Sequence, residues 1–205
     1  MYYPYGYYGF DWTYLVLVLP CILLSMWASS SVNSTFRKYA KVASSRHLTG
    51  AEAAQRVLSA NGVRGVRIER VSGNLTDHFD PKTNVIRLSD SVYGSTSVAA
   101  IGVAAHEAGH AVQYAQNYAP IRLRAAIIPI TNIGSKLAMP LILAGILLSF
   151  LGNFSYTLVY LGIAAFSLSL VFQLVTLPVE FNASRRALET IESSGLLTYE
   201  EQRGA

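Results

Sequence analysis

The chain has 205 residues, of which 52% are hydrophobic and only 14% are charged, and its mean hydropathy is positive. This composition excludes a disordered chain and is unusual for a soluble domain, so a membrane protein is the first class to test. The net charge of +4 comes from basic residues that form no stripe with interleaved aromatics, which argues against nucleic-acid binding. The single cysteine, Cys21, excludes an intrachain disulfide framework and a cysteine-rich zinc site.

The first apolar run covers residues 13–31 and has the length and composition of a membrane-spanning helix. A cleaved signal peptide is the alternative, but such peptides begin with basic residues and this chain has none before the run. Basic residues instead follow it, beginning with Arg37 and Lys38. By the positive-inside rule, we expect residues 1–31 to hold an outside N-terminal segment and a transmembrane helix, with residue 32 onward in the cytoplasm.

Two further apolar runs, at about residues 133–152 and 156–178, are separated by a short uncharged linker. Each run approaches the roughly 20 residues that a bilayer-spanning helix needs. Basic residues lie on both outer flanks of the pair, whereas the linker has none. We therefore expect residues 133–178 to form a transmembrane hairpin whose two ends face the cytoplasm. A soluble, buried helical hairpin is the alternative.

The segment between the first run and the hairpin, residues 32–132, has the pattern of a small folded domain. A capping-box sequence predicts a helix over residues 49–61. Alternating apolar residues predict two short strands, 66–71 and 84–88. The second strand is either an edge that pairs with an extended peptide or an ordinary core strand. Residues 96–119 have a helical pattern, and their small apolar side chains indicate burial.

Inside the last of these helices lies an HExxH sequence, His106-Glu107-Ala108-Gly109-His110. Histidines at i and i+4 project from one helical face, so their nitrogens can share one zinc ion. Glu107 is turned about a third of the way around the helix, where it can reach a metal-activated water without ligating the metal. Burying two histidines and a glutamate among alanines and valines is costly unless they are paired, and a metal supplies the partner. Core histidines that bond backbone carbonyls are the alternative interpretation.

A catalytic zinc site needs a third protein ligand and an open fourth position. Glu180 is the candidate, because it is the first acidic residue after the apolar run and would be partly desolvated without a cation. Two expected membrane crossings separate it from His110, so both residues end on the same side. A surface glutamate at a helix start is the alternative. The competing ligands elsewhere in the chain are His47, Asp77, His78, Asp80, Glu189 and Glu192.

Four segments together resemble the YugP-type neutral zinc metallopeptidase family. They are LTDHFDP at 75–81, VAAHEAGHAVQ at 103–113, LVTLPVEFNASRRAL at 174–188 and the N-terminal anchor followed by basic residues. The resemblance covers nearly the whole chain, and the segments are specific in combination. It implies a membrane-embedded, gluzincin-like peptidase with Glu107 as the catalytic base and with zinc on His106, His110 and Glu180.

Ser184 stands where the related membrane metalloproteases have an aspartate, in a Glu-x-x-Ala-Asp segment. A serine offers a zinc-binding histidine one hydrogen bond that is weaker than a carboxylate would make. His78, in the first of the four segments, is interpreted in two ways. It stabilises the oxyanion of the reaction, or it is a turn residue that fixes the strand after it.

Together these features predict a mainly α integral membrane protein, with about three transmembrane helices and a small cytoplasmic α+β zincin-like domain that carries the HExxH helix. Residues 179–205 are expected to form a cytoplasmic helix with the third zinc ligand. The predicted function is that of a zinc-dependent metalloendopeptidase at the cytoplasmic face of the cell membrane, acting on peptides or membrane proteins, with no nucleic-acid partner.

Two other functions remain as alternatives. A non-catalytic zinc-binding membrane scaffold or adaptor would need a fourth protein ligand and would be expected to lack Glu107, which is present. A transporter is disfavoured, because the apolar runs contain almost no ionisable residues to form a pathway.

Overall fold

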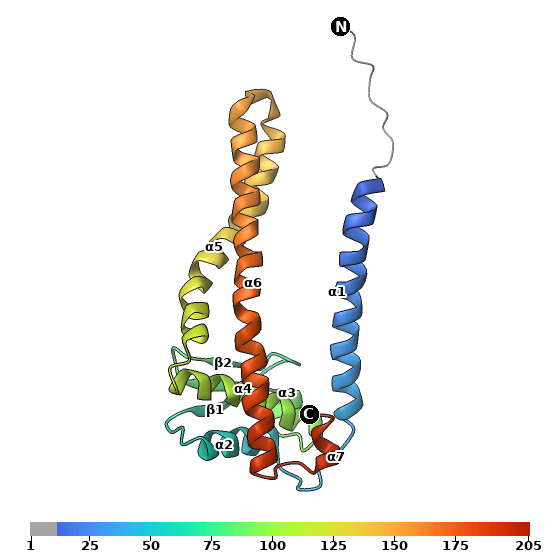
Figure 1. Ribbon diagram of the computed structural model, residues 1–205, viewed down its shortest axis with the longest axis vertical. Helices are drawn as coiled ribbons and strands as arrows, with labels where there is room; N and C mark the ends of the chain where they lie inside the picture. Colours follow the sequence, from blue (N-terminus) through green and yellow to red (C-terminus); the bar gives the residue numbers. More distant parts are fainter. Residues whose placement is uncertain (1–11) are drawn as a thin grey trace.

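A computed structural model describes residues 12–205, so the first eleven residues of the expected outside segment lie beyond the described part of the chain. Three long helices dominate it: α1 (Trp12–Tyr39), α5 (Ala119–Leu147) and α6 (Asn153–Ser193). Helices α5 and α6 form an antiparallel hairpin, and α1 stands beside it (Figure 1). The strands and the shorter α-helices form a compact base at the end of these helices away from the hairpin tip.

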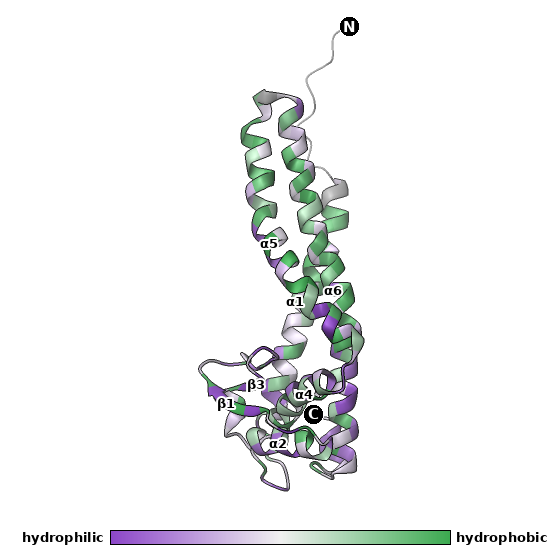
Figure 2. Ribbon diagram, turned by 90° about the vertical axis from the view of Figure 1, so that its left-hand side faces the viewer, coloured by the Kyte–Doolittle hydropathy of each residue, from purple (hydrophilic) through white to green (hydrophobic). Residues whose placement is uncertain are grey.

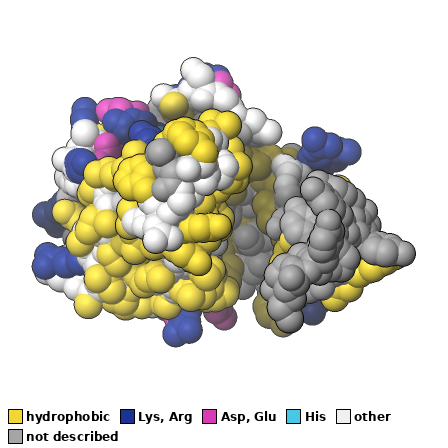
Figure 3. Space-filling view, turned by 90° about the horizontal axis from the view of Figure 1, so that it is seen from above, with side chains coloured by type: hydrophobic (Ala, Val, Ile, Leu, Met, Phe, Trp, Pro, Cys, Tyr) yellow, Lys and Arg dark blue, Asp and Glu magenta, His cyan; other side chains and the backbone are white. Residues whose placement is uncertain are grey.

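All three long helices have the length and composition needed to cross a bilayer. Their apolar side chains are largely exposed: Trp27 is 69% exposed on α1, Leu147 is 76% exposed on α5 and Phe166 is 63% exposed on α6. Hydrophobic residues run along the long helices while hydrophilic ones gather in the base (Figure 2). Seen from the hairpin tip, the surface of the hairpin is mainly hydrophobic (Figure 3). Because a soluble hairpin would bury these side chains, their exposure favours an apolar environment.

The helices of the hairpin are longer than their apolar runs. Helix α5 begins at Ala119, well before the run that starts near residue 133, and α6 continues without a break through Pro178 to Ser193. The short 3₁₀ turn η1 (Ser149–Leu151) and Gly152, with a φ of 61°, close the hairpin. Glu180, the candidate for the third ligand, therefore lies on the same helix as the apolar run at residues 156–178.

The base contains a three-stranded sheet in the order β1-β3-β2. Strands β1 (Arg67–Val71) and β3 (Val85–Ser89) are parallel, and β2 (His78–Asp80) pairs with β3 in the antiparallel sense. The two predicted strands are confirmed, but the interpretation of residues 84–88 as an edge strand is wrong because β3 is the central strand. The edge nearest the HExxH helix is β2, which has only three residues and no alternation that a sequence pattern could reveal.

Four helices complete the base: α2 (Gly50–Ala60), α3 (Asp90–Tyr93), α4 (Val98–Ala115) and α7 (Tyr199–Gln202). The capping box predicted before α2 is present, because Thr49 Oγ1 accepts from Glu52 N at 3.2 Å and Glu52 Oε2 accepts from Thr49 N at 2.8 Å. Helix α4 lies at the centre of the core, as its small apolar residues predicted. The fully buried side chains of this core include Ile101 of α4 itself and Val57, Leu58, Ile86, Leu88 and Ile191 of other elements.

Helices α4 and α6 approach very closely where they cross. A Cβ atom on Gly109 would lie 2.6 Å from the backbone oxygen of Ala183, which is closer than real Cβ contacts allow. Glycine is therefore required at this position if the two backbones are to keep their separation. The close crossing brings the turn of α6 that carries Glu180 against the face of α4 that carries the two histidines.

Candidate metal centre

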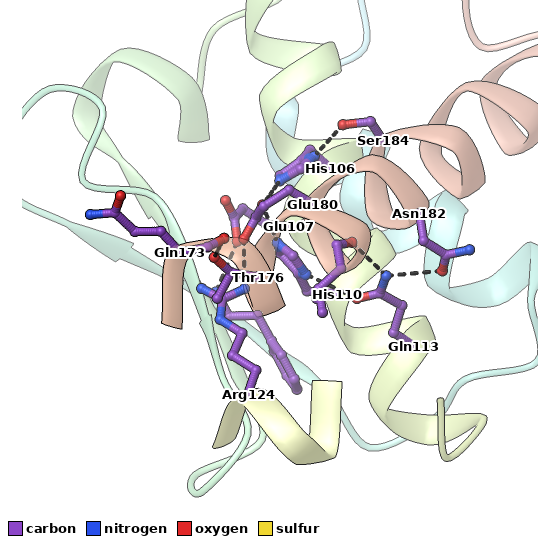
Figure 4. Close-up of polar contacts among 12 residues, drawn as sticks. His106, Glu107, His110, Gln113, Arg124, Gln173, Thr176, Glu180, Asn182 and Ser184 are labelled. Carbon is purple, nitrogen blue, oxygen red and sulfur yellow. Dashed lines mark hydrogen bonds and ion pairs between the residues drawn. The ribbon is translucent and has the colours of Figure 1, made fainter. Parts of the chain in front are cut away.

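Helix α4 presents His106 and His110 on one face, as the i and i+4 spacing predicted. Their rings are in edge-to-face contact with centroids 4.7 Å apart. His110 is buried and His106 is half-buried. Each ring directs its Nε2 atom toward the same carboxylate of α6, and Figure 4 shows the side chains converging.

Glu180 supplies that carboxylate. Its Oε2 lies 3.2 Å from His106 Nε2 and 3.2 Å from His110 Nε2. We call these three residues the ligand cluster; one potential ligand atom from each lies within 4.8 Å of the others. In the part of the chain that the structure describes, this is the one group of three or more such side chains with metal-binding spacing.

The ligand cluster fits zinc. Two imidazole nitrogens and one carboxylate oxygen are an established ligand set for catalytic zinc. Ligands held about 2.0–2.1 Å from a tetrahedral ion are roughly 3.3–3.4 Å apart, close to the observed nitrogen–oxygen separations. Burial by itself lowers the pKa of His110, but its hydrogen bond with Glu180 and the charge of Glu107 outweigh burial and raise that pKa overall. The site thus favours positive charge.

Both histidines are oriented by a hydrogen bond on the far side of the ring. His106 Nδ1 lies 3.0 Å from Ser184 Oγ, and His110 Nδ1 lies 3.1 Å from Gln113 Oε1. An Nδ1–H that donates to either oxygen leaves Nε2 with its lone pair facing the ligand cluster. Ser184 thus contacts one of the two histidines, and it does so with a single hydroxyl.

Gln113 also joins α4 to α6. Its side chain is fully buried, and Nε2 donates to Val179 O at 2.8 Å and to Asn182 Oδ1 at 2.9 Å. These two acceptors lie on either side of Glu180 in the sequence. One amide therefore holds the His110 ring and the helical turn that carries Glu180 at the same time (Figure 4).

The second oxygen of Glu180 is held by Arg124 of α5. Arg124 donates from a guanidinium nitrogen to Glu180 Oε1 at 2.6 Å, while Oε2 faces the histidines. In the sequence analysis, the basic residues on the flanks of the hairpin, which include Arg124, served only to predict membrane orientation. The contact with Glu180 had no sequence signal, because α5 and α6 meet here only through the tertiary fold.

Glu107 lies beside the ligand cluster without joining it. Its Oε2 accepts a hydrogen bond from the backbone N–H of Phe79 on β2 at 3.0 Å. Burial raises the pKa of Glu107, whereas the two histidines and the Phe79 N–H act in the opposite direction. A half-buried carboxylate with a raised pKa next to a candidate metal centre has the properties of a general acid–base group.

His78 lies on β2 and is exposed. Its Nδ1 is 2.9 Å from Thr76 O, and its ring lines the same cavity as His106, Glu107 and His110. Within residues 12–205, His78 makes no hydrogen bond or ion pair with the ligand cluster, so it lies near the candidate ligands without being bonded to them. As a member of β2 it is a strand residue.

The competing ligands lie outside the ligand cluster. Asp77 accepts hydrogen bonds from the backbone and side chain of Ser89, and Asp80 accepts from Thr83 and Arg87. His47, Glu189 and Glu192 are exposed. The structure therefore brings Glu180, and none of its competitors, to the two histidines.

The fold and the site define a mostly helical protein with three apolar helices and a candidate metal centre built on an HExxH helix and a distant glutamate. Residues 14–205 match the model of a family described as "Putative neutral zinc metallopeptidase". The chain belongs to this family.

A similar protein is the "Putative membrane protease YugP" of Bacillus subtilis (strain 168). It is 46% identical over 191 residues, which cover 93% of this chain and 83% of that protein. No solved structure matches the chain.

Proposed function

We propose that this protein is a zinc-dependent endopeptidase that hydrolyses peptide bonds of membrane proteins or membrane-adjacent segments at the cytoplasmic surface. The single observation that carries the proposal is the convergence of His106, His110 and Glu180 with Glu107 beside them. Family membership agrees with it. Three protein ligands leave the fourth position of a tetrahedral zinc open, as catalysis requires.

The chain's own residues have distinct roles in this proposal. His106, His110 and Glu180 would hold zinc, which supplies Lewis-acid activation of a water and of the substrate carbonyl. Glu107 takes a proton from the attacking water, whose oxygen adds to the carbonyl carbon. The carbon–nitrogen bond then breaks, and Glu107 returns the proton to the leaving amine. His78, at the rim of the same cavity, is the candidate donor to the oxyanion.

The proposal is tested with purified protein in detergent and a generic unstructured protein substrate. Glu107→Gln should keep zinc but lower kcat by about 10²–10⁴-fold, because an amide cannot accept the proton. Glu189→Gln is the matched control, since Glu189 is exposed on α6 and outside the ligand cluster. A chelator should abolish hydrolysis, and added zinc should restore it.

Two outcomes would contradict the proposal. Undiminished hydrolysis by Glu107→Gln would exclude this residue as the base. Stoichiometric zinc in a wild-type protein that hydrolyses no peptide would favour the scaffold. Against the scaffold stands the ligand cluster itself, which has three protein ligands within residues 12–205 where a closed structural site has four.

The membrane orientation is a separate part of the proposal. Basic residues flank the apolar segments on the base side, which supports the proposal that the base and the ligand cluster lie in the cytoplasm and the hairpin tip outside. In a Cys21→Ser background, an impermeant thiol reagent added to intact cells should label Asn153→Cys at the tip and spare Ser45→Cys. The reverse pattern would invert the orientation and leave the hydrolytic mechanism unaffected.

A further inference from the structure

A cavity of about 230 Å³ opens directly beside the ligand cluster. One wall is formed by His106, Glu107, His110 and Glu180, so whatever enters it lies against the reacting groups. Ligand-binding pockets for whole small molecules usually measure roughly 300–1,000 Å³, so this volume suits one part of a larger molecule. A single side chain of a bound peptide meets that description.

Much of the remaining lining of the cavity is apolar. Ile121, Ala125 and Ile128 of α5 follow the i, i+4, i+7 spacing of one helical face, and all three line the cavity. Phe79 and Tyr114 also line the cavity, and their rings pack edge to face with centroids 6.1 Å apart and an interplanar angle of 61°. Aliphatic and aromatic groups therefore make up much of the lining apart from the candidate metal ligands.

The polar groups that reach the cavity already have partners. Arg124 donates to Glu180, and Asp77 accepts from Ser89. An acidic substrate side chain would thus lie near Asp77 and Glu107 while Arg124 is already paired with Glu180, so it would lose its hydration without gaining a counter-charge. An apolar side chain would instead bury its surface against the apolar wall.

The path of α5 explains why the space exists. Helix α5 bends along its length, and its first turns lie away from α6 while its later turns lie beside it (Figure 1). Pro129 lies inside the helix, where it removes one backbone hydrogen bond and is a common cause of a bend. The turns before Pro129 are those that carry the apolar face of the cavity.

We propose that this cavity is a specificity subsite that receives an apolar side chain of the substrate residue next to the scissile bond, with Ala125 setting the largest side chain accepted. The inference rests on the proposed peptidase function and adds a substrate class to it. Peptides with a large aliphatic or aromatic residue beside the cleaved bond are preferred over those with alanine or aspartate there.

The experiment compares kcat/KM for peptides that differ only in the two residues flanking the scissile bond, with alanine, leucine, phenylalanine or aspartate placed at each in turn. Wild type should prefer leucine or phenylalanine over alanine at one flank by about tenfold or more. Ala125→Leu narrows the cavity and should shift the preference toward alanine. Ile128→Ala widens it and should shift the preference toward phenylalanine.

Ala126→Leu is the matched control. It is the same substitution one residue along α5, at an exposed position that does not line the cavity, so its preference should equal that of wild type. The peptide ranking is measured within each variant, so a general loss of folding or activity does not alter it. Ala125→Leu and Ile128→Ala are expected to shift the peptide preference in opposite directions, so the subsite can still be tested if one of the two variants does not fold.

The outcomes separate the subsite from the function. Hydrolysis with an unchanged ranking in both Ala125→Leu and Ile128→Ala would overturn the subsite and leave the peptidase standing. The subsite would also be overturned if Ala126→Leu changed the peptide ranking as much as Ala125→Leu does. Absence of hydrolysis by wild type on every peptide would overturn the proposed function and the subsite together.

Discussion

The crossing of α4 with α6 and the upper part of the α5–α6 hairpin use the same packing device for different ends. In both places a glycine lets two helix backbones approach: a Cβ on Gly109 would lie 2.6 Å from Ala183 O, and one on Gly145 would lie 2.8 Å from Ser155 O. At the crossing, the close approach brings a carboxylate to two imidazoles. In the hairpin it brings together apolar helices whose outer faces are exposed.

This difference shows which interactions each region depends on. If the hairpin lies in lipid, as we propose, its apolar helices gain nothing from hydrophobic burial against each other, and close backbone contact and hydrogen bonds such as that between Ser135 and Ser169, at 2.6 Å, hold them together. The crossing instead buries polar groups, and each one must be paired. Substitutions at the crossing should therefore lower zinc affinity, whereas substitutions in the hairpin should lower only the stability of the fold.

The largest effect is expected from Glu180→Ala at the crossing. Loss of a ligand should weaken zinc affinity by more than the roughly 100-fold that loss of an outer hydrogen-bond partner causes. Glu189→Ala and Glu192→Ala, both at exposed positions on α6, should leave zinc affinity unchanged. Affinity is measured by competition with a chromogenic chelator. If Glu180→Ala kept its full zinc affinity and His78→Ala lost it, the third zinc ligand would be His78 and not Glu180.

Next comes Gln113→Leu, which tests whether one amide positions both ligand-bearing helices. Zinc affinity should fall by about 10–100-fold because the His110 ring and the Glu180 turn lose their common support. Gln116→Leu is the matched control, since Gln116 is exposed at the end of α4 and contacts Arg186.

A purely structural role for Gln113 would give a different pattern. Unpaired buried groups cost about 1–3 kcal/mol, so the Tm of the zinc-free protein should fall in Gln113→Leu. If Tm fell while zinc affinity equalled that of wild type, Gln113 would stabilise the fold without positioning the ligands.

The third prediction compares alanine substitutions at the two glycines, Gly109 at the crossing and Gly145 in the hairpin. Gly109→Ala and Gly145→Ala should each destabilise the fold by about 1–3 kcal/mol, because each new methyl group meets backbone atoms. Zinc affinity should fall only in Gly109→Ala, where the helices that separate carry the ligands. Thermal unfolding and chelator competition on the same samples measure both quantities.

The control for the glycine pair is Gly94→Ala, since a Cβ there meets nothing within 4 Å and the backbone φ is −101°. Its Tm and zinc affinity should match those of wild type. A loss of zinc affinity in Gly145→Ala equal to that in Gly109→Ala would show that the hairpin and the crossing are one cooperative unit.

The smallest effect is expected in the turn before β3. Hydrogen bonds from Thr83, Lys82 N and Arg87 lower the pKa of Asp80 to about 2. A carboxyl whose folded-state pKa lies below its unfolded value of 3.8 stabilises the fold above pH 3.8, and this contribution is lost as pH falls toward 2.

Asp80→Asn should lower the Tm by about 1–3 °C at pH 7, since ion pairs between partly exposed side chains such as Arg87 and Asp80 contribute little. The difference from wild type should shrink as the pH is lowered from 4 to 2, and zinc affinity at pH 7 should not change. A Tm difference that stayed constant over this pH range would show that the carboxylate charge is not what stabilises the turn.

Periodicity alone predicted much of this protein. The i, i+4 spacing of His106 and His110 requires no tertiary contact, because one helix sets it. The capping box at Thr49 and the three apolar helices likewise depend on neighbours in sequence. The choice of Glu180 among its competitors also began with sequence, from its position directly after an apolar run.

Tertiary structure decided everything that joins separate elements. Strand β2 is three residues long, so only its pairing with β3 identifies it, and Phe79 reaches Glu107 through that pairing. Arg124 meets Glu180 because the hairpin folds α5 back against α6. Local patterns report which face a side chain takes, but the partner across that face depends on the packing of distant segments, and in this protein those partners orient the candidate metal ligands.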